Sequence, residues 1–348
     1  MREFHIGGRR IGEKHPAFVI AEMSANHNQS FGDAVAIIRA AKEAGADAIK
    51  LQTYTPDTIT IDSDKEYFRI KGGLWDGEIL YGLYKKAYTP WEWQPKLKKI
   101  ADELGILLFS TPFDKTSVDL LQEMNVPAYK IASYELIDIP LIEYIAAKGK
   151  PIIMSVGLAT LGEIEEAVNA ARNAGAPEIA LLKCTSAYPA PPDEINLKTI
   201  PHLANAFDVV AGLSDHTTGI AVPVASIALG ASVIEKHFTL SRDRGGPDAA
   251  FSLEPSELKA MVEAIRTAEK AIGKVNYEVT AGEGEGRAFR RSLFIVRDVK
   301  AGEVFTEENV RSIRPGQGLL PKYIKKVLGK KASMDIEKGT PLEWDMVK

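Results

Sequence analysis

Eight short apolar runs, separated by helical patterns, constrain the fold of this 348-residue chain more than any other feature. Each run has the length of a strand and is bounded by polar, Gly or Pro residues, as expected of strands buried on both faces. Eight strands alternating with helices predict an α/β fold, a (β/α)8 TIM barrel. The predicted strands are residues 18–21, 48–52, 107–110, 128–131, 151–155, 179–183, 209–213 and 233–236.

Helical patterns lie between the predicted strands. The clearest spans residues 160–174, because Thr160 and Glu163 form a capping box at its start and Gly175 follows its end. An open doubly wound sheet is the alternative, but no Gly-x-Gly-x-x-Gly motif follows a strand to support it. Further helices are predicted at residues 33–44, 116–124, 141–147, 220–229 and 255–272.

The chain changes character after residue 272. Residues 273–287 contain four glycines and no apolar periodicity, which predicts a linker. Residues 288–348 contain short strand-like runs and predict a second domain, small enough that we expect it to dock on another surface. The barrel domain is assigned to residues 1–272, with an N-terminal extension at 1–17 and, after the second strand, an insertion at 53–92 that is expected to be functional or structured.

Composition narrows the class of protein. Lys and Arg total 43 and Asp and Glu total 47, a formal charge of −4 that gives no sign of a nucleic-acid surface. No run of about 18 apolar residues and no signal-peptide core occurs, so we expect no membrane span and a cytoplasmic protein. Cys184 is the only cysteine, which excludes a disulfide within the chain. Its place in a buried strand predicts a structural thiol rather than a nucleophile.

Charged side chains gather where the predicted strands end, which is the end of a barrel that carries active sites. Lys50 and Gln52 are two residues apart on one strand, so they face the same side. Lys130, Glu22 and Glu235 lie at the ends of other strands. Charges inside a barrel mouth are costly unless they are paired or bind a ligand. We therefore expect an anionic ligand with compensating acids.

Hydroxyl groups accompany the lysines at the same mouth. Lysine supplies a point charge and hydroxyls supply directional hydrogen bonds, a combination that suits a phosphate and a carboxylate. No Walker motif is present, so transfer of a nucleotide phosphate is not expected. The residues concerned are Lys50, Thr111, Lys130, Ser133, Ser186 and Ser214.

Two histidines end neighbouring predicted strands. His216 follows the seventh strand and His237 follows the eighth, and adjacent strands lie about 4.8 Å apart. The two imidazoles can therefore share one cation and leave coordination positions open, as a catalytic metal requires. The alternative is a pair of histidines that are simply hydrogen-bonded to nearby acids.

Seven sequence blocks, in order, resemble the sialic acid synthase family, whose members condense phosphoenolpyruvate with an N-acetylated sugar. Any single block is weak evidence for the family, whereas the ordered set is strong evidence and covers nearly the whole chain. Residues 291–293 (RSL) and 314–318 (RPGQG) resemble the C-terminal antifreeze-like (SAF) domain of that family. The blocks are residues 20–27 (IAEMSANH), 46–53 (ADAIKLQT), 110–113 (STPF), 129–133 (YKIAS), 183–189 (KCTSAYP), 212–216 (GLSDH) and 234–238 (IEKHF).

The insertion selects a branch of the family. Its motifs at residues 71–77 (KGGLWDG) and 89–93 (TPWEW), together with Ser186 after Cys-Thr, resemble the pseudaminic acid branch. The resemblance implies condensation of phosphoenolpyruvate with 2,4-diacetamido-2,4,6-trideoxy-L-altrose, with metal-assisted C–C bond formation, to give pseudaminic acid and phosphate. N-acetylneuraminate or legionaminate synthesis is the alternative within the family.

The resemblance also implies roles for individual residues. His216 and His237 would bind a divalent metal, Mn²⁺ or Mg²⁺ with Co²⁺ as a further option, and Glu22 would lie near the reacting carbons. The chain would form a homodimer in which the SAF domain covers the active site of its partner. The phosphoenolpyruvate contacts would be Lys50, Thr111, Lys130, Ser133, Ser186 and Ser214, and the sugar contacts Gln52, Glu135, Tyr188, Asp248 and Arg314.

Two rival functions come from other classes. One is a non-catalytic sugar-binding protein, against which the intact lysine and histidine positions argue. The other is an aldolase that uses a Schiff-base lysine. Borohydride trapping with substrate separates this aldolase from the proposed synthase, which forms no imine.

Overall fold

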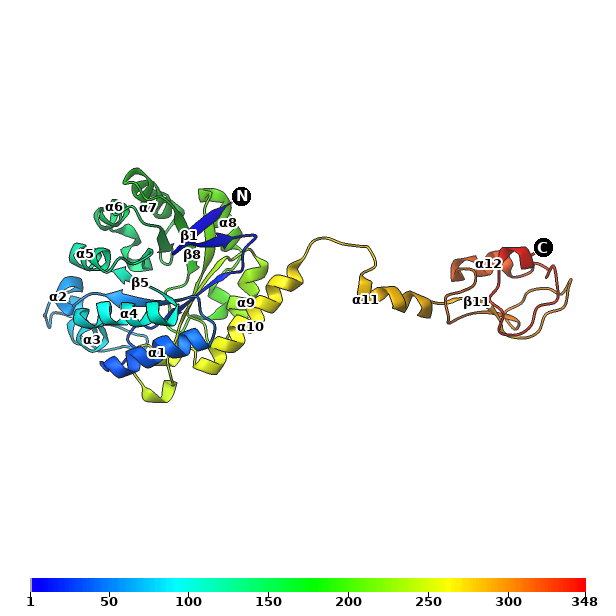
Figure 1. The fold of residues 1–348 in the computed structure, drawn as a ribbon, viewed down its shortest axis with the longest axis horizontal. Helices are drawn as coiled ribbons and strands as arrows, with labels where there is room; N and C mark the ends of the chain where they lie inside the picture. Colours follow the sequence, from blue (N-terminus) through cyan, green and yellow to red (C-terminus); the bar gives the residue numbers. More distant parts are fainter. Residues whose placement is uncertain (1) are drawn as a thin grey trace. The chain divides into compact units, whose positions relative to one another are not determined.

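The computed structural model describes residues 2–348, and its first part is a closed barrel of eight parallel strands (Figure 1). The barrel closes where β10 pairs with β3, and the predicted TIM barrel is confirmed. All eight predicted strands are present, most of them extended by one or two residues. The strands are β3 (Phe18–Glu22), β4 (Ala48–Thr53), β5 (Leu107–Pro112), β6 (Tyr129–Ile131), β7 (Ile152–Ser155), β8 (Ile179–Cys184), β9 (Val210–Asp215) and β10 (Val233–His237).

Helices surround the strands and bury one apolar face against them (Figure 1). In α7 the predicted capping box is present, since Thr160 and Glu163 exchange hydrogen bonds. The helix predicted to begin near Trp93 is α4, whereas α8 was not predicted from the sequence and completes the outer layer. The helices are α1 (Phe31–Glu43), α4 (Gln94–Leu104), α5 (Lys115–Glu123), α6 (Ile139–Ala146), α7 (Leu161–Asn173), α8 (Thr199–Phe207), α9 (Ala221–Ala228) and α10 (Pro255–Ile272).

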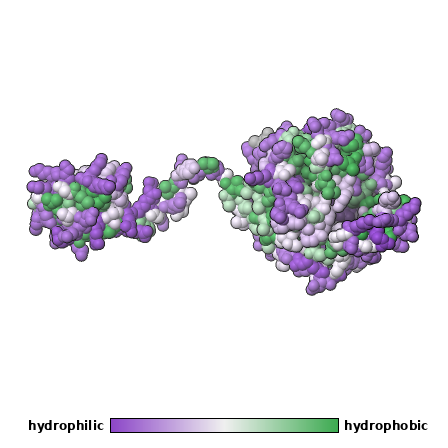
Figure 2. All heavy atoms as spheres, turned by 180° about the vertical axis from the view of Figure 1, so that it is seen from behind, coloured by the Kyte–Doolittle hydropathy of each residue, from purple (hydrophilic) through white to green (hydrophobic). Residues whose placement is uncertain are grey.

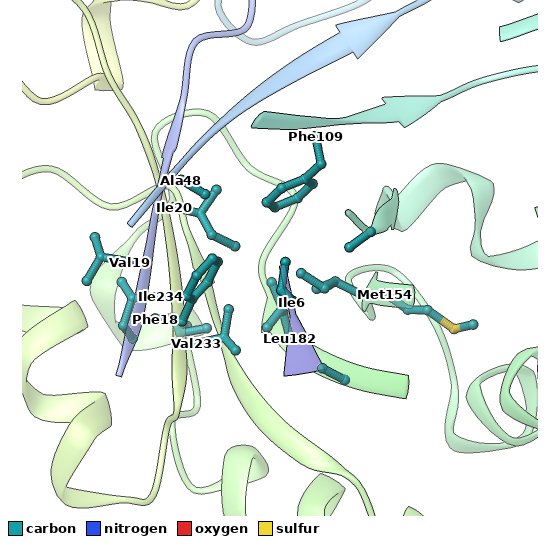
Figure 3. Close-up of a cluster of buried hydrophobic side chains, with 14 of the residues drawn as sticks. Ile6, Phe18, Val19, Ile20, Ala48, Phe109, Met154, Leu182, Val233 and Ile234 are labelled. Atoms are coloured by element: carbon teal, nitrogen blue, oxygen red, sulfur yellow. The ribbon is translucent and has the colours of Figure 1, made fainter. Parts of the chain in front are cut away.

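The N-terminal extension is a hairpin of β1 (Glu3–Ile6) and β2 (Arg9–Gly12). Its apolar side chains, including Ile6, are fully buried and join the barrel core (Figure 3). The His5 backbone N–H donates to Glu178, the residue directly before β8. The hairpin therefore packs at the amino ends of the strands, opposite the end where barrel active sites form.

The insertion after β4 has secondary structure of its own. It contains α2 (Pro56–Ile59), η1 (Glu66–Phe68), α3 (Leu80–Ala87) and η2 (Trp91–Trp93). Thr53, where we placed its start, is the last residue of β4. The insertion thus leaves the carboxyl end of a barrel strand, which places it at the rim of the expected site.

The chain divides into two compact units, Met1–Gly273 and Lys274–Lys348. The second unit has its own apolar core, and hydrophilic residues cover most of its visible face (Figure 2). The segment predicted as a linker contains a short helix, whose capping box was not recognised from the sequence. The elements of this unit are α11 (Ala281–Gly284), η7 (Glu285–Phe289), the antiparallel pair β11 (Ser292–Ile295) and β12 (Val310–Ile313), η8 (Pro321–Tyr323), α12 (Ile324–Val327) and η9 (Trp344–Met346).

Within residues 2–348, no helix combines the length and the apolar character needed to cross a membrane.

Candidate active site

A buried charge cluster occupies the carboxyl ends of the barrel strands. Glu22 on β3 and Lys50 on β4 are paired in register, and the Lys50 Nζ lies 2.7 Å from a Glu22 carboxylate oxygen. Glu235 on β10 lies 3.4 Å from the Lys50 Nζ and 4.0 Å from the Lys130 Nζ. All four side chains are at least nine-tenths buried. Strand alternation has therefore gathered four charges in one small, dry volume.

The surroundings separate the protonation states of the two carboxyl groups. Burial raises the pKa of Glu22 to about 7, against the opposing charge of Lys50 and with a contribution from Glu235. Burial also acts on Glu235, but Lys130 and Lys50 outweigh it and hold its pKa below the usual value. Near neutral pH the cluster therefore contains two lysines and one carboxyl group, that of Glu235, that stays ionised. That balance favours an anionic ligand.

The predicted hydroxyl groups line the same mouth. The Lys50 Nζ donates to Thr111 Oγ1 at 3.2 Å, and Ser214 Oγ donates to Glu235 at 3.4 Å. The Gly157 backbone N–H donates to Ser133 Oγ at 3.0 Å. A Cβ on Gly157 would lie 2.7 Å from Ser133 Oγ and 2.5 Å from Ser186 Oγ, so any larger residue would displace both hydroxyl groups. These two serines thus converge on one backbone position.

His216 and His237 lie side by side, with ring centroids 5.3 Å apart. His216 Nδ1 is 3.0 Å from the Thr185 carbonyl oxygen and donates to it, which leaves Nε2 free. His237 Nδ1 is buried without a hydrogen-bond partner. Burial, together with the charge of His216, holds the pKa of His237 well below its usual value. A neutral imidazole with an unused nitrogen is what a metal ligand requires.

The histidine pair fits a metal better than the alternative of histidines bonded to acids. In the part of the chain that the structure describes, neither His216 nor His237 forms an ion pair with a carboxylate. No group of three or more His, Cys, Asp or Glu side chains that could hold a metal ion occurs among these residues. Any metal held by the pair would therefore take its other ligands from substrate or water. Cys184 is buried with its Sγ 4.0 Å from His216 Nδ1.

The barrel residues predicted to contact a sugar lie around the charge cluster. Gln52 donates to Glu22 at 3.1 Å and to Ser24 at 3.0 Å, and Ser24 in turn donates to Asp248. These hydrogen bonds join Gln52 and Asp248 to Glu22 in one network. Asp248 is buried, and burial raises its pKa.

Two more members of the sugar set follow β6 and β8, Glu135 in the short 3-10 helix η3 (Ser133–Ile137) and Tyr188 in a loop. Glu135 has a buried carboxylate oxygen without a partner, and burial raises its pKa to about 7. The Tyr188 ring centroid is 4.3 Å from that of His216. Arg314 belongs to the second unit, where it is exposed just after β12.

Comparison with known protein families decides the classification. The model of the NeuB family matches residues 37–277, and the model of the SAF domain matches residues 290–348. This chain belongs to the NeuB family. The predicted resemblance is confirmed for both parts of the chain.

Relatives of this NeuB-family chain include named synthases. A pseudaminic acid synthase of Campylobacter jejuni is 49% identical over 326 residues, which is 94% of this chain and 95% of the relative. The pseudaminic acid synthase of Helicobacter pylori is 45% identical over 331 residues, covering 95% of this chain and 97% of the relative. An N-acetylneuraminic acid synthetase structure from Leptospira borgpetersenii, in complex with citrate, superposes with a TM-score of 0.73 at 34% identity, covering 82% of this chain and 95% of that one.

Sequence reasoning missed two members of this NeuB-family site. Ser155 ends β7 and accepts a hydrogen bond from the Lys130 Nζ at 2.7 Å. Its signal was the one used for the other hydroxyls, a polar residue ending a buried strand. Gly157 carries no such signal, because its importance comes from a close approach between loops that are distant in the sequence.

Proposed function

We propose that this chain condenses phosphoenolpyruvate with 2,4-diacetamido-2,4,6-trideoxy-L-altrose to give pseudaminic acid and phosphate. The observation that carries the proposal is the buried Lys50–Glu22–Glu235–Lys130 cluster beside His216 and His237, of which His237 is kept neutral by burial. This cluster occurs in a chain that is 49% identical to a pseudaminic acid synthase over 94% of its length. A non-catalytic sugar-binding relative would have no need to keep two lysine side chains buried away from water, where their charges are costly.

Phosphoenolpyruvate would bind through the lysines and hydroxyls of the barrel mouth. Its carboxylate and phosphate would exchange water for the ammonium groups of Lys50 and Lys130, with the hydroxyls completing the hydrogen bonds. Glu235 would remain ionised and keep both lysines charged in the absence of ligand. The hydroxyl donors are Thr111, Ser133, Ser155, Ser186 and Ser214.

His216 and His237 would hold a divalent metal, Mn²⁺, Mg²⁺ or Co²⁺. When bound, such an ion acts as a Lewis acid toward the aldehyde oxygen of the open sugar. The Thr185 carbonyl fixes the orientation of the His216 ring, and burial keeps His237 neutral. The His216 ring is therefore oriented, and His237 is unprotonated, before a metal binds.

The chemistry then depends on orientation of the two substrates. C3 of phosphoenolpyruvate forms a bond to the aldehyde carbon, and the cationic C2 takes up water. The tetrahedral intermediate expels phosphate as its C–O bond to C2 breaks. Holding both substrates in one site makes the first step effectively unimolecular. Glu22, with a pKa of about 7, can exchange a proton at neutral pH, so we assign it to the water or to the cationic carbon.

The sugar assignment predicts a clear preference. Wild-type protein incubated with phosphoenolpyruvate and Mn²⁺ should release phosphate with the diacetamido-trideoxy sugar at a kcat/KM at least about tenfold above that with N-acetylmannosamine, since one apolar group is worth about 10–200-fold in a pocket. Phosphate release and the nonulosonic acid product are both measured. Comparable turnover of N-acetylmannosamine would move the chain to the neuraminate branch. No turnover of any N-acetylated sugar would overturn the proposal.

We also propose that the protein acts as a homodimer in which the SAF domain of one subunit covers the site of its partner. Arg314 would then reach an acetamido oxygen of the sugar in the partner's site. Arg314→Ala should raise the KM for the sugar by about ten- to a hundredfold, in line with the loss of a charged hydrogen bond, and leave the KM for phosphoenolpyruvate unchanged.

Mixing two impaired variants, at a sugar concentration well below the KM of Arg314→Ala, tests the shared site. Heterodimers of Arg314→Ala and His237→Ala contain one site in which both parts are wild type, so they should recover part of the activity. Arg311→Ala, at an exposed position in the same unit, is the matched control. Confirmed heterodimers without any recovery would mean that each chain builds its own site.

A further inference from the structure

The insertion after β4 contacts the sugar side of the candidate site through Trp75. The indole Nε1 of Trp75 donates to the Pro247 carbonyl at 3.0 Å. Its ring lies 5.6 Å from the ring of Tyr188, tilted by 52°. Two independent contacts therefore hold one indole against two loops that follow β8 and β10.

Both contacts lead to residues assigned to the sugar. Tyr188 itself belongs to that set, and Pro247 directly precedes Asp248. The Tyr188 ring also lies 5.2 Å from the ring of Phe251 and 4.3 Å from that of His216. Trp75, Tyr188 and Phe251 thus form an aromatic wall next to the histidine pair. An aromatic wall offers dispersion contacts and few hydrogen-bond acceptors.

Two other aromatic residues of the insertion, Tyr67 and Tyr81, differ from Trp75 in their surroundings. Tyr67 is 91% exposed. The Tyr81 hydroxyl donates to Asp57 within the insertion itself, at 3.1 Å. Trp75 is half-buried, with its polar N–H already used by Pro247. The remaining surface of the indole is apolar.

We propose that Trp75 is a specificity-determining residue that selects a sugar with apolar substituents. This inference rests on the proposed function and names the group that enforces it. A C6 methyl or an acetamido methyl gains contact with the wall, whereas a hydroxymethyl group placed there loses its hydrogen bonds to water. The indole thus favours the 6-deoxy, diacetamido sugar and penalises N-acetylmannosamine.

The test compares two sugars across variants. Trp75→Ala should lower kcat/KM for 2,4-diacetamido-2,4,6-trideoxy-L-altrose by about 10–200-fold. It should leave kcat/KM for N-acetylmannosamine within about threefold and the KM for phosphoenolpyruvate unchanged. Trp75→Phe, which keeps an aromatic ring, should retain most of the preference and shows that the effect is not a folding defect. Tyr67→Ala, in the same insertion but exposed, is the matched control and should behave as wild type.

The outcomes separate this inference from the proposed function. A wild type that prefers N-acetylmannosamine ends the proposed function, and this inference with it. If the wild type prefers the diacetamido sugar and Trp75→Ala shows the same ratio of the two kcat/KM values, the inference alone is overturned. An equal loss for both sugars would likewise overturn it, because Trp75 would then only hold the loop of Asp248 in place.

Discussion

Replacing either His216 or His237 by alanine should abolish condensation, with a loss of at least about a thousandfold, and leave the barrel folded. The physical reason is that each histidine would supply half of the ligands that the protein offers to the metal. A bound metal stabilises the charge of the transition state by several kcal/mol, and each 1.36 kcal/mol corresponds to a tenfold change in rate. The two rings lie at the rim of the core, 5% and 7% exposed, so their removal leaves the apolar core untouched.

Three measurements check this prediction. Phosphate release reports activity, calorimetric titration with Mn²⁺ reports metal affinity, and thermal unfolding reports the fold. His202→Ala, at an exposed position on α8, is the matched control and should retain activity and metal affinity. Full activity of wild-type protein after thorough chelation would remove the metal from the mechanism. Undiminished Mn²⁺ binding by both variants would show that the metal binds at another site.

The barrel could be predicted because its strands are buried on both faces and therefore read as continuous apolar runs. The N-terminal hairpin was missed although its signal is present. Phe4, Ile6 and Ile11 are fully buried, and Gly7 and Gly8 form the turn with φ of 55° and 82°. A Gly-Gly pair between apolar positions is a hairpin signal. The segment was instead set aside as an extension before the barrel.

The site shows where sequence reasoning ends. The charge cluster followed from strand ends and a period of two, which places Glu22, Lys50 and Glu235 inside one mouth. Glu135 and Tyr188 were noticed because they follow strand ends, but their sugar-contact role was assigned by resemblance alone, because periodicity does not define the paths of the segments after the strands. The positions of Gly157 and Trp75 depend on approaches between segments far apart in the chain, which only the folded structure reveals.

Glu22→Gln should abolish condensation and at the same time stabilise the ligand-free protein above neutral pH. The folded-state pKa of Glu22, about 7, exceeds the ordinary value of 4.5. Below pH 4.5 both the folded and the unfolded states are protonated, and the carboxyl costs nothing. Between pH 4.5 and 7 only the unfolded state loses its proton, so unfolding becomes easier as the pH rises. Above pH 7 the penalty stays constant at about 3 kcal/mol.

Denaturant unfolding without substrates, at pH 5 and pH 8, measures this penalty. The free energy of unfolding should fall with pH by about 2–3 kcal/mol more in wild type than in Glu22→Gln. Glu135, whose pKa is also about 7, contributes the same fall to both proteins, so the difference isolates Glu22. Glu92→Gln, at an exposed position, should follow wild type. Identical pH dependence in wild type and Glu22→Gln would mean that Lys50, 2.7 Å away, keeps Glu22 ionised throughout. Glu22 would then have no proton to exchange at neutral pH, and stabilisation of the cationic carbon would be its remaining role.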